Sequence, residues 1–153
     1  MIGQYREMFV TATSFLECAD YCFNAENSFV KGFHTPAIVN YAFACEVYLK
    51  LLLLHRGIKI KSHELLELFK QLPEEKQKQI MIKMFNNGIW LTDAFGRNEL
   101  YNISDAFVKW RYRYESSTLS CNVGFLQELA KVLRDECCES IFGSAWNNLK
   151  GVI

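Results

Sequence analysis

The fold is decided by the stretch ACEVYLKLL at residues 44–52, an apolar segment that carries an acid, Glu46, and a base, Lys50. Gly57 ends this segment, since glycine is common just past the last residue of a helix. A second informative stretch, FVKWRYRYE, lies at residues 107–115. Along the chain the apolar residues recur at three- and four-residue steps, without the alternation typical of strands, so the pattern predicts helices.

The composition suits a single domain. The chain has 153 residues, half of them apolar or aromatic, which is enough to bury one sizeable core. We therefore expect one domain over residues 1–153. Seventeen basic residues balance seventeen acidic ones, so the whole molecule has no net attraction for nucleic acid or for an anionic membrane. Any binding of that kind must come from a local patch.

The chain carries no signal for export, for a membrane span or for a metal site. Charged residues at positions 6, 7, 17 and 20 interrupt its beginning, unlike a secretory signal. The longest apolar stretch, residues 47–54, is far shorter than the roughly 20 residues of a membrane span. The six cysteines lack the Cys-x-x-Cys spacing of a zinc site. We expect a cytoplasmic protein with buried, reduced thiols, no metal, no cofactor and no membrane contact.

Start and stop signals divide the first half of the chain into helices. The first helix carries an apolar stripe and ends near Gly32. The second begins at Thr35 and Pro36, a capping residue followed by proline, and ends at Gly57. Ser62 is expected to cap a third helix. Because the loop between the first two long helices is short, they should be antiparallel.

The second half of the chain predicts three more helices. Pro73 begins the fourth, which stops before Gly88. The pattern of the next stretch, residues 89–101, is ambiguous and predicts no particular structure. A fifth helix runs from about Asn102 to Tyr114, and a sixth follows Asn122. The whole pattern predicts an all-α, up-and-down bundle of five or six helices.

The apolar helix with its embedded Glu46 and Lys50, together with the stretch at residues 107–115, resembles the HEPN family of small helical domains. The resemblance covers about residues 5–140. It implies a HEPN-like fold that forms a homodimer and binds RNA, a nucleotide or a nucleotidyltransferase-type partner protein, in a phage-defence or toxin–antitoxin setting. The twelve Phe, seven Tyr and three Trp also favour a dimer, because some of them should form an apolar patch that a monomer leaves exposed.

Glu46 and Lys50 are the first candidate site residues. They are four residues apart with the acid first, which is the favourable orientation for an ion pair on a helix. Because a lone charge among apolar neighbours is unstable, each must be paired or face a cleft. Two interpretations of Glu46 and Lys50 are therefore possible: a structural ion pair, or a pair with a role in a ligand groove. The resemblance implies a position beside an intersubunit or ligand cleft.

His63 follows a basic loop that contains Arg56, Lys59 and Lys61. If Ser62 caps a helix, His63 lies at a helix N-terminus, where free N–H groups favour anions. Two roles remain open for it. It either faces a phosphate together with these basic side chains or is an ordinary surface residue that supports the cap.

Basic and aromatic residues alternate in WRYRYE at residues 110–115, a pattern that can pair a phosphate and stack a base. Arg111 and Tyr114 are three apart and should share a helix face, whereas Arg113 points elsewhere. The candidate nucleotide or RNA contacts are Arg111, Tyr112, Arg113 and Tyr114. The alternative is that this helix only packs on its neighbours.

Catalysis is a separate question. HEPN ribonucleases carry an arginine followed, after four to six residues, by a histidine, and two subunits together form a metal-independent site. Neither Arg111 nor Arg113 is followed by a histidine at that spacing. Arg56 and His63 match it, but they span the loop between the second and third helices. We therefore expect a non-catalytic or weakly catalytic binding domain. The alternatives are an active metal-independent endoribonuclease and a structural helical adaptor.

Overall fold

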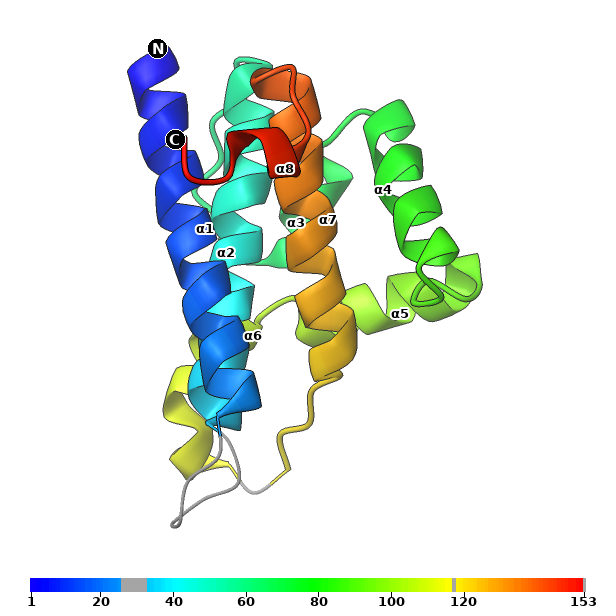
Figure 1. Cartoon of the computed structure of the whole chain (residues 1–153). Coiled ribbons are helices and arrows are strands. Elements are labelled where there is room, and N and C mark those ends of the chain that lie inside the picture. Colours follow the sequence, from blue (N-terminus) through cyan, green and yellow to red (C-terminus); the bar gives the residue numbers. More distant parts are fainter. Residues whose placement is uncertain (26–32, 117, 153) are drawn as a thin grey trace.

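A computed structural model describes residues 1–25, 33–116 and 118–152, and within them every regular element is a helix (Figure 1). Five helices in these ranges have eleven residues or more: α1 (Ile2–Asn24), α2 (His34–His55), α4 (Glu74–Asn86), α5 (Asp93–Ile103) and α7 (Val123–Ile141). The shorter ones are α3 (Leu65–Lys70), α6 (Ala106–Lys109), the 3-10 helix η1 (Trp110–Glu115) and α8 (Trp146–Leu149). The all-α bundle expected from the sequence is confirmed.

α1 and α2 lie side by side and antiparallel, as predicted (Figure 1). Phe9 of α1 packs on Tyr48 of α2, with the ring centroids 5.9 Å apart. The hydroxyls of Thr13 and Tyr48 form a buried hydrogen bond of 2.8 Å. This bond satisfies two polar groups that would otherwise be costly to bury.

The ends of these two helices differ in part from the prediction. α1 ends at Asn24, ahead of the expected Gly32, which lies outside the described residues. α2 begins at His34 after Phe33, so Thr35 does not cap the helix and stands in its first turn. The backbone N–H of Phe33 donates to the carbonyl of Cys22 at 2.9 Å, and this contact with the end of α1 fixes where α2 starts. The stop at Gly57 is confirmed.

α2 is the core of the bundle and is covered by α1, α3, α6 and α7. Its length and composition satisfy the requirements for a membrane span, and 72% of its most apolar stretch is buried inside the fold. The apolar stretch at residues 47–54 is thus part of a longer helix that is apolar as a whole. Burial of this extent is also found in the core helix of a bundle.

The prediction of a single helix over residues 102–114 is wrong. α5 ends just before Ser104, whose carbonyl accepts the N–H of Leu65 at 2.9 Å and whose hydroxyl accepts the N–H of Leu66 at 3.0 Å. The first N–H groups of a helix have no partner within it, so Ser104 satisfies the start of α3 from a distant part of the chain. The chain then continues as α6 and η1, and Tyr114 is 81% exposed, outside the expected stripe.

The start and stop signals predicted for α4 and the start signal predicted for α7 are confirmed. Pro73 precedes α4, and Gly88 follows it with a positive φ of 76°. The side chain of Asn122 caps α7 by accepting the N–H of Phe125 at 3.0 Å. In the stretch that the sequence left open, Thr92 caps α5 in the same way.

The six cysteines are free thiols. Cys45 and Cys137 are buried, but Cys18 is exposed, so the expectation of buried thiols is wrong for that residue. Burial raises the pKa of Cys138 to about 11 and that of Cys121 to about 12. At neutral pH these two thiols stay protonated and are poor nucleophiles.

Candidate functional site

Glu46 is a buried carboxylate at the centre of the candidate site. Its side chain is 3% exposed, and its Oε1 accepts from Lys50 Nζ at 2.7 Å and lies 2.9 Å from His63 Nδ1. Its Oε2 is buried and has no hydrogen-bond partner among the described residues. The ion pair with Lys50 confirms the spacing argument. It also offsets the charge of Glu46, since a buried carboxylate must be paired.

His63 is oriented by Glu46. Because a carboxylate only accepts hydrogen bonds, Nδ1 is the nitrogen that carries the proton, and Nε2 is left for a ligand. The side chain of His63 is 57% exposed. A histidine with one nitrogen fixed by a carboxylate and the other open to solvent is held in one tautomer and one orientation.

The helix-terminus role predicted for His63 is wrong. α3 begins at Leu65, after Glu64, and Ser62 does not cap it. The hydroxyl of Ser62 instead accepts the N–H of Glu64 at 3.0 Å, outside the helix. The N–H groups of Leu65 and the next residue are already bonded to the distant Ser104. Neither of these two N–H groups is therefore free to bind an anion.

His63 and Arg111 both lie near the ring of Phe107. The guanidinium carbon of Arg111 lies over the ring of Phe107, 4.6 Å from its centroid. The imidazole centroid of His63 lies 6.1 Å from the centroid of the same ring. The guanidinium carbon of Arg111 and the imidazole centroid of His63 can therefore be no farther apart than the sum of their distances to Phe107. Phe43 of α2 stacks on Phe107 at 5.0 Å and anchors it to the core. We call Glu46, Lys50, His63, Phe107 and Arg111 the His63 surface.

η1 presents its other residues in different directions. Tyr112 is next to Arg111, with its ring centroid 5.6 Å from the guanidinium carbon. Arg113 turns away, as predicted, to lie over Trp110 and to donate to the carbonyl of Ser116 at 3.0 Å. Tyr114 is exposed. The expected pairing of Arg111 with Tyr114 is thus replaced by a pairing with Tyr112, because η1 is not a regular α-helix.

A groove of about 570 Å³ adjoins His63 between the segment before α3 and α6. Its lining residues are Ile60, Lys61, Ser62, His63, Glu64, Glu67, Asp105, Val108 and Lys109. Three carboxylates and two lysines line it, and Lys109 is already paired with Asp105 at 2.7 Å. That hydrogen bond and the nearby negative charge raise the pKa of Lys109. Asp105, Val108 and Lys109 were missed by the sequence analysis, although the first and last are four residues apart.

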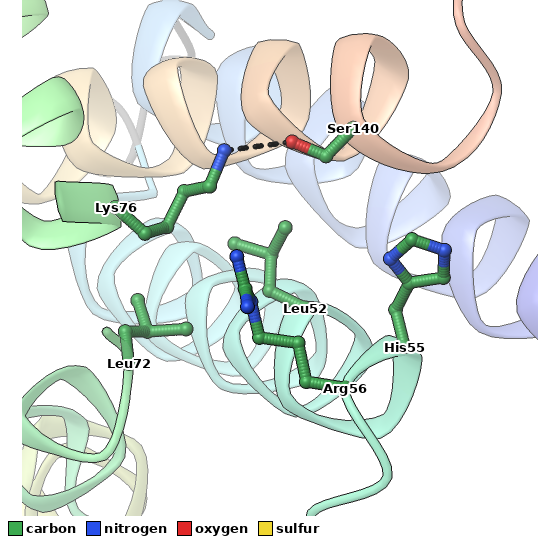
Figure 2. A pocket seen from close by; sticks show the side chains of 6 residues that line it. All are labelled: Leu52, His55, Arg56, Leu72, Lys76 and Ser140. Carbon is green, nitrogen blue, oxygen red and sulfur yellow. Dashed lines mark hydrogen bonds between the residues drawn. The ribbon is translucent and has the colours of Figure 1, made fainter.

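Two of the three remaining basic candidates do not line this groove. Lys61 lines it, whereas Lys59 is exposed and is not among its lining residues. Arg56 lines a different pocket at the C-terminal end of α2 (Figure 2). Arg56 and His63, which match the family spacing in sequence, therefore face different cavities.

The other two histidines are also engaged elsewhere. His34 packs near Phe23, with ring centroids 5.4 Å apart, and His55 packs edge-on to Tyr5 at 5.6 Å. Within the described ranges, no group of three His, Cys, Asp or Glu side chains is arranged to hold a metal ion. The candidate site therefore contains one imidazole, one guanidinium and a buried ion pair.

No protein-family model, curated protein or solved structure matches the chain. The resemblance to the HEPN family therefore depends on the apolar helix with Glu46 and Lys50 and on residues 107–115 alone.

Proposed function

We propose that the chain is a HEPN-like helical domain that binds a phosphate-bearing ligand of the nucleotide class on the His63 surface and is not an efficient enzyme. The observation that carries the proposal is that Arg111 lies over the ring of Phe107, 4.6 Å from its centroid, and that the ring of His63 lies 6.1 Å from the same centroid. A guanidinium stacked on an aromatic face keeps its in-plane N–H groups free to pair with a phosphate. His63 Nε2 adds a second polar contact.

The local charge supports an anionic ligand. Lys50 offsets Glu46, and Arg111 has no carboxylate within ion-pair distance among the described residues. The His63 surface therefore carries the uncompensated positive charge of Arg111. An anion is attracted to such a surface even though the whole chain is neutral.

The adjoining groove favours a small ligand over a long RNA strand. Its volume of about 570 Å³ lies within the range of ordinary small-molecule sites, about 300–1,000 Å³. Its charges are mixed, whereas a strand of RNA is bound along a continuous basic track. Ile60 and Val108 supply apolar area for a base. A nucleoside monophosphate, with its phosphate at Arg111 and its base in the groove, fits these features.

The same geometry argues against efficient RNA cleavage. Metal-independent cleavage needs one group to take the proton of the attacking hydroxyl and another to give a proton to the leaving oxygen. His63 is the only one of the three histidines at the site. Glu46 is buried and already bonded to Lys50 and His63, so it is not placed to serve as the second group.

The test is isothermal titration calorimetry of the full chain with AMP and GMP, with adenosine as the probe that lacks a phosphate. We expect a nucleotide to bind and adenosine to bind more weakly. Arg111→Ala should weaken binding about 10-fold or more, the effect of losing a charged hydrogen bond. Raised salt should weaken it further.

Two controls sharpen this test. Arg111→Lys keeps the charge but loses the planar fork, and it should be weaker than the parent if the fork pairs the phosphate. Arg97→Ala removes an arginine that is exposed on α5 and paired with Asp93, so it should change nothing. Nucleotide binding unaffected by Arg111→Ala would overturn the proposed site. A short RNA that binds far more tightly than either nucleotide would favour a strand as the ligand, and no binding of either would favour the helical adaptor.

A further inference from the structure

A second pocket, of about 430 Å³, lies at the C-terminal end of α2. Its lining residues are Leu52, His55, Arg56, Leu72, Lys76 and Ser140. They come from α2, from the segment before α4, from α4 and from α7, so the pocket forms only when these elements pack together. It shares no lining residue with the groove at His63. We call it the α2-end pocket.

Lys76 is fixed on one side of the α2-end pocket by a buried carboxylate. Its Nζ donates to Glu136 Oε2 and to Ser140 Oγ, both at 2.8 Å. Glu136 is 2% exposed, and its other oxygen accepts from Lys83 at 2.7 Å. Lys83 also meets the exposed Glu139 at 3.1 Å. These two lysines and two carboxylates offset one another, which holds the ammonium of Lys76 in place without adding net charge.

Arg56 supplies to the α2-end pocket a positive charge that no ion pair among the described residues offsets. It is exposed, and no carboxylate of the described residues lies within ion-pair distance of it. Figure 2 shows Arg56 and Lys76 extending from α2 and α4 on opposite sides of the pocket, with His55 at its edge. An oxyanion placed between them would meet a guanidinium and an ammonium at once.

The pocket also offers a neutral donor and an apolar wall. Because the oxygen of Ser140 accepts a hydrogen bond from Lys76, its own O–H is free to donate to a ligand. An ammonium has three N–H donors, and Lys76 uses two of them in the bonds described. Leu52 and Leu72 supply the apolar part of the lining. These features suit a phosphate group attached to a small apolar fragment.

We propose that the α2-end pocket binds a small organic phosphate, with its phosphate group held by Arg56, Lys76 and Ser140 and its organic part against Leu52 and Leu72. A phosphate accepts several hydrogen bonds in tetrahedral directions, and the three donors come from three helices or helix ends around it. The site is independent of the proposed nucleotide site, because a different arginine, on a different cavity, supplies its charge.

The experiment is a titration of the isotope-labelled full chain with phenyl phosphate, followed by amide NMR shifts. We expect saturable shifts at Arg56, Lys76 and Ser140. Arg56→Ala should weaken binding about 10-fold, since a hydrogen bond to a charged group contributes about 1.5–3 kcal/mol. Ser140→Ala should weaken it several-fold, and Arg97→Ala should leave it unchanged.

The choice of variants keeps the fold intact. Arg56 is exposed and makes no ion pair with a described residue, so its removal leaves no buried group unpaired. Lys76 is kept, because its loss would leave Glu136 with one partner fewer in a buried position. Arg111→Ala separates the two sites. It should weaken nucleotide binding on the His63 surface about 10-fold or more and leave the shifts at Arg56 unaltered.

Several results would overturn the proposal. They are shifts that grow linearly without saturation, shifts of the same size in Arg56→Ala, and loss of binding in Arg111→Ala with retention in Arg56→Ala. Benzyl alcohol and benzoate are the probes for the chemical class. Equal binding of benzyl alcohol would show that the phosphate is not recognised, and tighter binding of benzoate would show that the pocket takes carboxylates instead.

Discussion

The Gly96→Ala substitution sets helix propensity against packing. Gly96 lies within α5, where alanine is favoured over glycine by about 0.8–1 kcal/mol. A Cβ at this position would lie 2.0 Å from Cε2 and 2.2 Å from Nε1 of Trp90, whereas non-bonded carbons approach to about 3.5–4 Å. The indole is not free to move aside, because it is buried between Phe69 and Phe125, with ring centroids 6.2 and 5.8 Å away.

Packing should therefore outweigh propensity. Overpacking a core costs about 1–3 kcal/mol, and contacts this short belong at the upper end of that range. After the gain in propensity is subtracted, the free energy of unfolding should fall by about 2 kcal/mol, which corresponds to a Tm about 4–8 °C lower for a chain of this length. Urea denaturation followed by far-UV circular dichroism measures the loss.

Gly124→Ala is the matched control. Gly124 also lies in a helix, α7, but the nearest neighbour of its Cβ would be 3.6 Å away, which is an ordinary contact. This variant should be as stable as the parent or more stable by up to about 1 kcal/mol. If Gly96→Ala proved equally stable, the packing of Trp90 against α5 would be refuted.

Acid should weaken the fold through Glu136. Burial raises its pKa, but the hydrogen bonds and charges of Lys76 and Lys83 outweigh this and lower it below the ordinary value of 4.5. The free energy of unfolding should therefore fall as the pH drops below about 4.5, and the loss should be smaller in Glu136→Gln. Mixed-sequence RNA incubated with the protein and a chelator should remain largely uncut, since a missing proton-transfer group lowers the rate roughly 100- to 10,000-fold. Robust cleavage abolished by His63→Ala or Arg56→Ala would contradict this. Light scattering at micromolar concentration should give twice the mass of one chain, and a monomer mass would count against the homodimer.

Helix ends could be predicted where their signal is local. Gly57 and Gly88 have positive φ values of 79° and 76°, and Asn122 accepts a hydrogen bond from a residue three positions later. Each of these devices acts within about one turn of helix. The start of α2 was mispredicted because Phe33 is bonded to Cys22, a contact between two helices that no local pattern encodes.

The contacts of the candidate site also divide into local ones, which the sequence pattern predicts, and long-range ones, which it does not. The Glu46–Lys50 ion pair and the packing of Arg111 on Phe107 both join residues four apart on the chain, and that spacing is visible in the sequence. The bond between Glu46 and His63 crosses a loop, and it depends on how the segment before α3 folds back onto α2. Sequence reasoning could name both residues, but it could not place them together.

The break at Ser104 shows why the periodicity misled. In a continuous helix the residues at 103, 107, 110 and 114 would share one buried stripe. The chain is interrupted at Ser104 and again in η1, where Tyr112 has non-helical φ and ψ; Trp110 stays buried while Tyr114 is exposed, and Phe107 stacks on Phe43 of α2. Phe107, packed on the core in this way, is the platform on which Arg111 lies.

The distribution of ion pairs bears on the two proposed anion sites of a chain that has no net charge. Lys50 is paired with the buried Glu46, and Lys76 and Lys83 with the buried Glu136. A buried carboxylate requires such partners, so the positive charges of these lysines are offset, although Lys76 keeps one N–H that can donate to a ligand. Arg56 and Arg111 form no ion pair within the described part of the chain, and each is exposed beside α2. Each of these two arginines can therefore attract an anion to the cavity or surface beside it, a local effect that the net charge of the whole chain does not reveal.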